Sequence, residues 1–377
     1  MLASVGESEC VRLSILNTQR LLFIIHCLIS IVHCSLTSVQ CLLSLMSYLG
    51  FSLCALVIFF AGSRRSRYGD MLSNLTGMGK AWIGLILMAA VTSLPELMVG
   101  ISSAAIVGSA DLAIGDIFGS CAFNLLLLAL LDAFMPRNQP LLGTSSPGHV
   151  LAATLGTILM AMAGLGILLP EEIVLLPSIG ITSFSFMVVY LVAVNVLFKY
   201  NRQVNVKEEE KTSSVPEGMT LRKVTMLYSL AAIVVIGAAL ALPGFASDIA
   251  KQTGLGESFV GTLFLAVSTS LPEIAVSLAA IRMGSADMAV GNLLGSNIFN
   301  IFILFIDDLV YSGDHLLKDA SDNHAISAFA VIIMSSIAII GLTFRSQHKR
   351  FFMAYDALLI FVVYIINLMI LYYLESP

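Results

Sequence analysis

Long apolar stretches, separated by short polar connections, follow one another along almost the whole chain. Ten of them are long enough to cross a bilayer as a helix, which needs about 20 apolar residues. They lie at about 41–61, 81–106, 112–134, 149–169, 172–198, 225–246, 258–281, 287–311, 323–343 and 351–374. In lipid only helices and closed barrels satisfy their backbone hydrogen bonds, and these stretches are far too long for barrel strands. The pattern predicts an all-α polytopic membrane protein with ten transmembrane helices.

The composition agrees with a chain whose main partner is the lipid bilayer. Of 377 residues, 58% are hydrophobic and 11% are charged, whereas soluble domains carry about 25% charged residues. The net charge of −5 is small, and no basic run is interleaved with aromatic residues, so we expect no nucleic acid partner. The six cysteines form no C-x-x-C pair and indicate no disulfide scaffold. No cofactor is indicated.

One polar interval, 199–224, mixes both charges with Ser, Pro and Gly and divides the ten stretches into five and five. We therefore expect a first five-helix unit at 41–198, a linker at 199–224 and a second five-helix unit at 225–377. The N-terminal segment 1–40 contains a shorter apolar run at 21–33 behind two arginines. That run resembles a signal peptide or anchor, and a helix on the membrane surface is the alternative.

Lys and Arg are distributed unevenly between the two sets of connections. The connections after the odd-numbered stretches hold fifteen of them, and the opposite side of the ten-stretch core holds only Lys251 and Lys318. Cytoplasmic loops carry the excess of Lys and Arg. The asymmetry predicts a multi-pass protein of the cell membrane, plasma or inner, with the central linker in the cytoplasm.

A long segment of the chain occurs twice. Thr-Ser-Leu-Pro-Glu ends at Glu96 and again at Glu273, an offset of 177, and each copy continues through a similar stretch to Asn124 and Asn300, an offset of 176. Each copy occupies the second and third stretches of a five-stretch unit, so the two copies enter the membrane from opposite sides. Such inverted repeats are typical of secondary transporters, whose substrate site lies near the midplane between the repeats.

The repeated segment places Glu96 and Glu273 in the middle of apolar stretches. An ionised carboxylate at that depth costs several kcal/mol unless it is paired or solvated. We find no Lys or Arg within the repeats' stretches to neutralise them, so a bound cation is the expected partner. The alternative is that both glutamates are protonated, hydrogen-bonded structural residues.

Other oxygen-bearing side chains recur around the two glutamates. Pro95 and Pro272 each free a backbone carbonyl by removing a helical hydrogen bond, and hydroxyls precede each glutamate by three and four residues. In the next stretch, polar residues recur every four positions. The side chains are Thr92, Ser93, Thr269 and Ser270, then Asp116, Ser120 and Asn124, mirrored by Asn292, Ser296 and Asn300. Oxygen ligands without thiolate or imidazole favour Na⁺, Ca²⁺ or Mg²⁺.

The remaining polar residues of the stretches carry weaker expectations. Asp111 and Asp287 lie where a carboxylate complements the dipole at a helix start, and His149 and His324 lie at stretch edges, where we expect them to be solvated. Gly115-x-x-x-Gly119 and its copy Gly291-x-x-x-Gly295 are expected to pack the helices of each repeat closely together. Three carboxylates at the ends of the third and eighth stretches are candidates for an ion vestibule: Asp132, Asp307 and Asp308.

The duplicated Thr-Ser-Leu-Pro-Glu, each followed by Gly-Ser-x-x-x-Asn, resembles the alpha-repeats of the cation/calcium antiporter superfamily, the sodium/calcium exchangers and their prokaryotic relatives. The resemblance implies ten helices in two inverted five-helix repeats around four central ion sites. The ion ligands that it implies are Thr92, Ser93, Glu96, Ser120, Asn124, Thr269, Ser270, Glu273, Ser296 and Asn300, with the backbone carbonyls of Ala89 and Ala266.

The chain departs from the family pattern in the charge of the site. Many sodium/calcium exchangers place Asp at one of the positions held here by Asn124 and Asn300. The first repeat instead has Asp116 and Cys121 where Asn is usual. Asp116 therefore either restores the missing charge or accepts protons.

We accordingly predict a secondary active cation antiporter, with Na⁺/Ca²⁺ exchange by alternating access as the first hypothesis. H⁺-coupled exchange of Ca²⁺ or another divalent cation is the alternative. A passive cation channel and an intramembrane hydrolase are remote possibilities, and no hydrolase motif supports the latter, so we do not expect an enzyme. The oligomeric state stays open.

Overall fold

The computed structural model describes residues 44–69, 71–72, 75, 92–169, 174–176, 179–204, 219–345, 349 and 352–376. The chain divides into two units, residues 1–49 and 50–377. Of the first unit only the start of one helix is described, so the segment predicted at 1–40 lies outside the described residues. All that follows concerns the second unit.

Helices dominate the described residues. In chain order they are Ser44–Gly69, α3 Leu94–Ile101, the π-helix η1 Ser102–Val107, α4 Ala110–Phe134, α5 Leu141–Thr144, α6 Gly148–Leu168, α7 Ile181–Val204, α8 Leu221–Thr253, α9 Glu257–Val260, the π-helix η2 Gly261–Leu265, α10 Ala266–Thr269, α11 Leu271–Arg282, α12 Ala286–Val310, α13 Leu316–Asp319, α14 His324–Phe344 and α15 Tyr355–Glu375. One small antiparallel sheet pairs β1 Val174–Leu176 with β2 Ile179–Gly180.

Eight of the described helices are long and apolar enough to cross a membrane. A ninth span is made by Glu257–Thr269 and Leu271–Arg282, which meet at a bend of 46°. The shorter apolar helix Leu94–Val107 lies in the second predicted stretch, whose first part is outside the described residues. These positions are consistent with ten spans, and they confirm a polytopic helical membrane protein.

The largest difference from the predicted boundaries is at the fifth span. We placed its start at residue 172, but α7 begins at Ile181 and a hairpin precedes it. Pro177 lacks the backbone N–H that a helix interior needs, and Gly180 has a low helix propensity. The apolar residues before Ile181 therefore pair as short strands instead of extending the helix.

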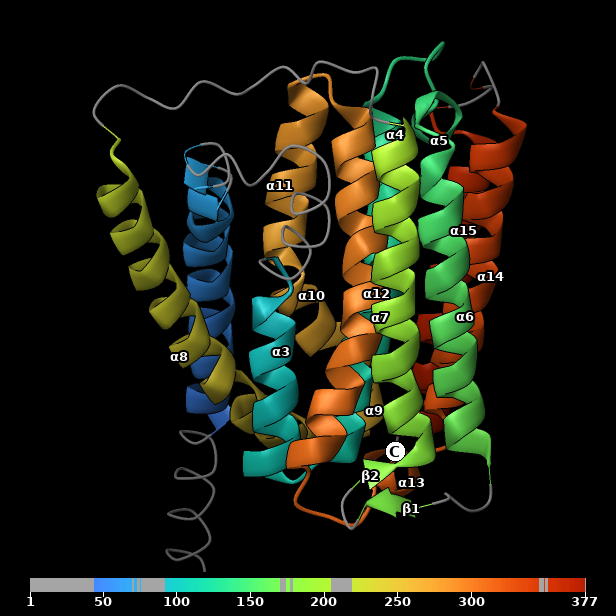
Figure 1. Cartoon of the computed structure of the whole chain (residues 1–377). Helices are drawn as coiled ribbons and strands as arrows, with labels where there is room; N and C mark the ends of the chain where they lie inside the picture. The colour runs from blue at the N-terminus through green and yellow to red at the C-terminus, as the bar shows by residue number, and fades with distance from the viewer. Residues whose placement is uncertain are drawn as a thin grey trace, which may run out of the picture. The chain divides into compact units, whose positions relative to one another are not determined.

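The two long helices that follow the repeated Pro-Glu motif, α4 and α12, form the centre of the second unit (Figure 1). In each, 83% of the most apolar stretch is buried, against 17% in α8. α4 contacts α12, η2, α14 and α15, and α12 also packs on α6 and α7. Helices that are apolar on all sides are expected in such a central position.

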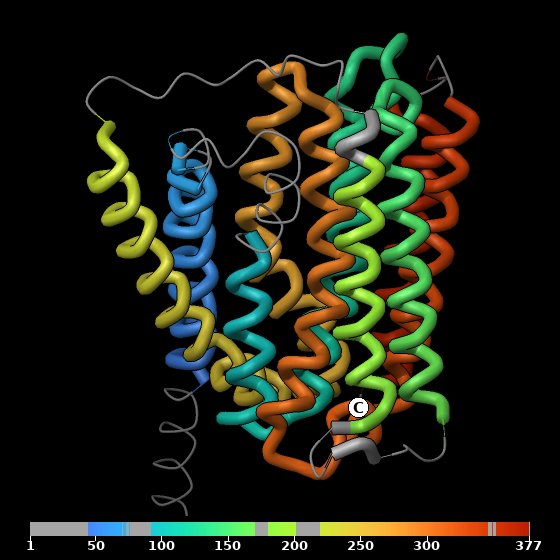
Figure 2. Tube along the Cα trace, viewed as in Figure 1, coloured from blue at the N-terminus to red at the C-terminus, as the bar shows by residue number. Residues whose placement is uncertain are grey.

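The two repeats have opposite directions in the fold. After its break, α3 runs from mid-height to the lower end of Figure 1, whereas α11 runs from mid-height to the upper end (Figure 2). Equivalent segments of the two copies thus face opposite ends of the bundle, as the odd number of spans per repeat requires.

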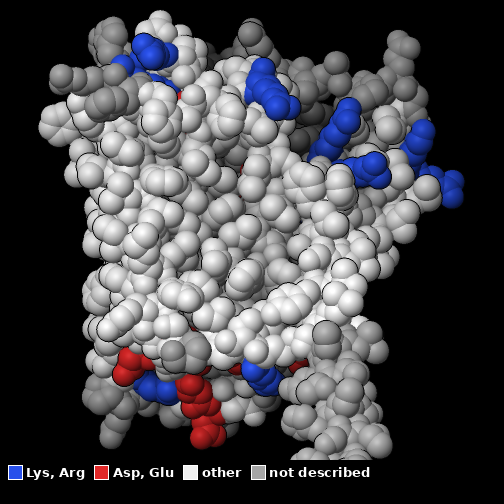
Figure 3. Space-filling model, turned by 180° about the vertical axis from the view of Figure 1, so that it is seen from behind, with Lys and Arg blue, Asp and Glu red and all other residues white. Residues whose placement is uncertain are grey.

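Charged side chains gather at the two ends of the bundle, with a wide uncharged band between them (Figure 3). Lys and Arg predominate at the upper end in this view, and Asp and Glu at the lower end, together with a few basic residues. This separation matches the asymmetry of the connections. The assignment of the basic end to the cytoplasm stays a prediction.

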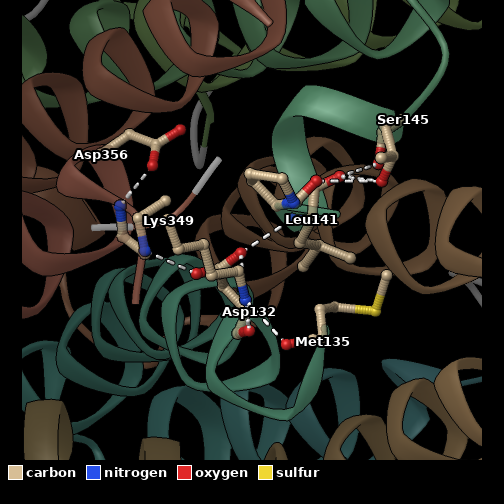
Figure 4. Close-up of polar contacts among 10 residues, drawn as sticks. Asp132, Met135, Leu141, Ser145, Lys349 and Asp356 are labelled. Atoms are coloured by element: carbon tan, nitrogen blue, oxygen red, sulfur yellow. Dashed lines mark hydrogen bonds and ion pairs between the residues drawn. The ribbon is translucent and has the colours of Figure 1, made fainter. Parts of the chain in front are cut away.

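Asp132 closes a structural network at the end of α4, which makes the vestibule prediction for it wrong. Its carboxylate accepts hydrogen bonds from the backbone N–H groups of Leu141 (2.7 Å) and Ala354 (2.8 Å), and it pairs with Lys349 Nζ at 3.2 Å (Figure 4). Asp308, its counterpart, accepts a bond from the N–H of Leu316 at 2.8 Å. Each carboxylate thus accepts the N–H of the first residue of the short helix that follows its span, α5 or α13.

Candidate cation-binding site

Both repeated Pro-Glu motifs lie at a break in a helix. Ser93 and Ser270 are the residues before α3 and α11, with backbone angles of φ −82°, ψ 18° and φ −84°, ψ 6°. The proline that follows each serine suits the first turn of a new helix, because its missing N–H would be unpaired there anyway. Glu96 and Glu273 therefore fall in the first turn, where the positive end of the helix dipole stabilises a carboxylate. Both glutamates are completely buried.

Hydroxyl groups of one repeat meet hydroxyl groups of the other in two equivalent pairs. Thr92 Oγ1 lies 3.3 Å from Ser296 Oγ, and Thr269 Oγ1 lies 3.2 Å from Ser120 Oγ. All four residues are completely buried. Each broken helix thus contacts the long helix of the opposite repeat, and the residues predicted from the duplication come together at the interface between the repeats.

The carboxylates lie in this same layer and carry oxygens without a hydrogen-bond partner. Ser270 Oγ donates to Glu96 Oε1 (3.3 Å), and Thr269 Oγ1 lies 3.0 Å from Asp116 Oδ1. Glu96 Oε2, Asp116 Oδ2 and both oxygens of Glu273 accept no hydrogen bond from the described residues. Buried polar atoms in proteins are normally paired, so this layer of acceptors suits a cationic ligand.

Carboxylates alone do not make a cage in this conformation. Within the part of the chain that the structure describes, no three His, Cys, Asp or Glu side chains are arranged to hold a metal ion. A cation bound here would therefore also need the hydroxyl, amide and carbonyl oxygens of the layer. Ca²⁺ accepts six to eight such oxygens in flexible geometry.

An asparagine that we did not predict connects the amides of the site. Asn124 Nδ2 donates to Asn297 Oδ1 (3.0 Å), and Asn297 Nδ2 donates to the carbonyl of Cys121 (3.1 Å). The contact leaves Asn124 Oδ1 without a partner. Asn297 is the counterpart of Cys121 under the 176-residue offset, so the signal lay in a position where the two copies differ in chemistry. Asn300 is completely buried, and Asn292 nearly so.

The glycines of the first repeat pack against the second repeat, and not against their own partner helix as we expected. A Cβ on Gly119 would lie 2.3 Å from the carbonyl oxygen of Thr262, and one on Gly115 would lie 3.0 Å from Gly261 Cα. α4 therefore fits directly against the backbone of η2. This contact lies next to the pair of Ser120 and Thr269, since Ser120 directly follows Gly119 and Thr269 lies about two turns after Thr262.

The two predicted backbone ligands have different outcomes. Ala89 lies outside the described residues. The Ala266 carbonyl accepts the N–H of Ser270 at 3.1 Å and lies 3.2 Å from the hydroxyl of Thr269, so both of its lone pairs face donors in this conformation.

A basic side chain lies inside the spans, contrary to our expectation. The first helix continues to Gly69, beyond the predicted end at 61, and carries Arg65 into the interior with an exposed fraction of 1%. The Arg65 guanidinium is within electrostatic range of Tyr228, Glu273 and Glu96, without an ion pair to a described carboxylate. A positive charge therefore lies near the site.

Two carboxylates at helix starts bind histidines of neighbouring elements, which corrects a second expectation. His324 Nε2 lies 3.0 Å from Asp111 Oδ1, and His149 Nε2 lies 3.0 Å from Asp287 Oδ1. Both histidines are buried, His324 completely, so neither is solvated as predicted. The two pairs are related by the repeat and join the starts of α4 and α12 to α14 and α6.

The arrangement of two inverted broken helices has a counterpart among known proteins. The family model of the sodium/calcium exchanger protein matches residues 46–198 and 223–373. The chain belongs to this family. Its members are transporters and not enzymes, which confirms the predicted class: an integral membrane antiporter of the cation/calcium superfamily.

Individual relatives of this family member agree in length and fold. The inner membrane protein YrbG of Escherichia coli (strain K12) is 28% identical over 272 residues, 69% of this chain and 81% of the relative. The solved structure of the sodium-calcium exchanger NCX_Mj matches 86% of this chain and 99% of its own, with 21% identity and a TM-score of 0.57. The H⁺/Ca²⁺ exchanger CAX matches 87% of this chain and 84% of its own, with 13% identity and a TM-score of 0.66. At these identities the two structures establish the fold alone.

Proposed function

We propose that the protein exchanges Ca²⁺ for Na⁺ at the buried oxygen layer between its two repeats. The observation that carries the proposal is the set of buried acceptor oxygens without partners on Glu96, Glu273 and Asp116, which come from both repeats. The ligands would be the residues predicted from the duplication: Thr92, Ser93, Glu96, Asp116, Ser120, Asn124, Thr269, Ser270, Glu273, Ser296 and Asn300, with the carbonyls of Ala89 and Ala266.

The position of the site between inverted repeats supports alternating access as the mechanism. Each hydroxyl pair joins a broken helix of one repeat to the long helix of the other. A shift of one repeat against the other would separate one side of this interface and close the other side, as in other transporters with inverted repeats. A cation that neutralises the carboxylates lowers the cost of moving them through lipid, so the loaded site reorients and the empty, charged site does not. Use of the same oxygens by Ca²⁺ and Na⁺ in turn produces exchange.

The topology that goes with this function has two five-helix units, 41–198 and 225–377, in the cell membrane. The two separate matches to the family, at 46–198 and 223–373, support this division. The basic end of the bundle, with the linker at 199–224, would face the cytoplasm.

Proton coupling is the second candidate, and Asp116 is the observation that favours it. Asp116 is completely buried and has one oxygen without a partner, beside Thr269. A carboxylate in that position can bind a proton when Ca²⁺ leaves. The CAX structure, whose name states H⁺/Ca²⁺ exchange, shares the fold.

The test is calcium uptake into proteoliposomes under one imposed gradient at a time. With purified wild-type protein, an outward Na⁺ gradient at equal pH on both sides is expected to drive uptake of radioactive Ca²⁺. A pH gradient without Na⁺ is expected to drive little. Uptake under the pH gradient alone, abolished in Asp116→Asn, would establish proton coupling instead. Equal Ca²⁺ flux with no counter-ion on the opposite side would contradict exchange altogether.

A further inference from the structure

Arg65 is a buried basic residue on a helix whose other arginines face outward. It lies on the helix Ser44–Gly69 with an exposed fraction of 1%, whereas Arg64 and Arg67 are exposed. Its Nε and Nη1 atoms have no hydrogen-bond partner among the described residues. An Arg guanidinium stays protonated in proteins, so this helix brings a permanent positive charge into the protein.

The neighbours of Arg65 belong to the proposed cation site. Gly62, one helical turn earlier, fits against the ring of Pro272: a Cβ on Gly62 would lie 2.6 Å from Pro272 Cγ. This contact brings the helix against the start of α11, directly beside Glu273. The guanidinium is within electrostatic range of Tyr228 of α8, of Glu273 and, more weakly, of Glu96, and it forms no ion pair with a described carboxylate. Its charge is thus felt most by Glu273 of the two glutamates.

No other described basic side chain has this environment. The second buried one, Lys349, is paired with Asp132 at 3.2 Å and binds backbone carbonyls at the end of α4. In α8, the first helix of the second repeat, Arg222, Lys223 and Lys251 are all exposed. Because an unpaired buried charge is strongly destabilising, the nearby carboxylates are what makes Arg65 tolerable where it is.

We propose that Arg65 is a resident cation of the exchange site, which neutralises one carboxylate permanently and so takes the place of one transported monovalent ion. The inference rests on the proposed function and adds the charge balance of the site. Glu96, Glu273 and Asp116 carry three negative charges when ionised, Arg65 carries one positive charge, and two negative charges remain. One Ca²⁺ or two monovalent cations neutralise that remainder. Asp307 is completely buried beside Gly100 and neither of its oxygens has a hydrogen-bond partner among the described residues, so it is counted as protonated and neutral.

The charge balance predicts transport that does not respond to the membrane potential. Exchange of one Ca²⁺ for two monovalent cations moves no net charge, and Arg65, being part of the chain, does not leave with the ions. Without Arg65 the site would have to take up a third monovalent cation, and each cycle would then move one net charge. The Ca²⁺ accumulation ratio would change by about tenfold for each 60 mV of potential.

The experiment measures Ca²⁺ accumulation in proteoliposomes at several potentials set with K⁺ and valinomycin. Wild type, Arg65→Lys and the control Arg64→Gln are expected to be insensitive to the potential. Arg64→Gln removes the same charge from the same helix at an exposed position. The Ca²⁺ flux of Arg65→Gln is expected to fall by at least about tenfold or to become dependent on the potential. Identical behaviour of Arg65→Gln and Arg64→Gln would overturn the proposal.

A second variant keeps the test decisive if Arg65→Gln fails to fold. Arg65→Gln combined with Asp116→Asn removes one charge of each sign, so it is expected to regain flux and insensitivity to the potential. A double variant that is no better than Arg65→Gln, or equally unfolded, counts against the proposal. If the wild type shows no exchange under a Na⁺ or pH gradient, the proposed function fails. If the wild type exchanges but Arg65→Gln matches Arg64→Gln, only this inference fails.

Discussion

The two repeats have the same backbone plan at the site but carry different charges. Each has a serine at a helix break, a buried glutamate in the first turn after the break, and a hydroxyl pair with the opposite repeat. The first repeat adds the anion Asp116 and the cation Arg65, whereas the second has neutral Asn292 and no buried basic residue on α8. With the buried Asp307 of the second repeat counted as neutral, the additions cancel, so each repeat contributes one net negative charge. The two repeats thus carry the same net charge although their residues differ.

Removing either glutamate charge should have the largest effect, and the effect should be the same in both repeats. Glu96→Gln and Glu273→Gln each leave too little negative charge for Ca²⁺, so Na⁺-driven Ca²⁺ uptake should fall by at least about 100-fold, since losing one charge of a buried set costs about 3–5 kcal/mol. Glu375→Gln, at the end of α15, is the matched control and should transport normally. Normal uptake in only one of the two site variants would show that the repeats are not equivalent.

The hydroxyl pairs should matter about equally in the two repeats. Thr269 lies beside Asp116 as well as Ser120, and Thr92 lies beside Glu273 as well as Ser296. Hydrogen bonds to charged groups contribute about 1.5–3 kcal/mol. Thr269→Val and Thr92→Val should therefore each raise the Ca²⁺ concentration for half-maximal uptake by about tenfold or more. A shift in only one of the two variants would argue that the hydroxyl pairs are not equivalent.

The glycine contact between the repeats should affect stability more than chemistry. A Cβ on Gly119 would lie 2.3 Å from the Thr262 carbonyl, whereas one on Gly156 would make an ordinary contact of 3.7 Å with Ile298. Gly119→Ala should cost about 1–3 kcal/mol and lower the thermal unfolding temperature of the detergent-solubilised protein. Gly156→Ala should leave that temperature nearly unchanged. A Gly119→Ala protein as stable as wild type would mean that α4 and η2 separate easily.

Much of the fold could be predicted because span length and the duplication are strong physical signals. The described spans occupy the predicted stretches, since burial in lipid requires about 20 apolar residues whatever their order. The duplicated residues come together because an odd number of spans inverts the second copy. Their role as ion ligands stays a prediction.

What could not be predicted depends on partners distant in sequence. We ended the first span at residue 61, yet the helix continues to Gly69 and buries Arg65 near Glu273. His149 and His324 are buried because Asp287 and Asp111 approach them from other helices. Asn297 enters the site through Asn124 of the opposite repeat. In each case a polar residue is tolerated inside because of a partner that local hydropathy does not reveal.

Equilibrium binding of radioactive Ca²⁺ to the purified protein shows whether Ca²⁺ and Na⁺ share one site built by both repeats. We predict one Ca²⁺ per chain, displaced competitively by Na⁺. We also predict loss of binding in both Glu96→Gln and Glu273→Gln and retention in Glu375→Gln. Ca²⁺ binding that persists in either site variant, or that Na⁺ does not displace, would contradict a shared site.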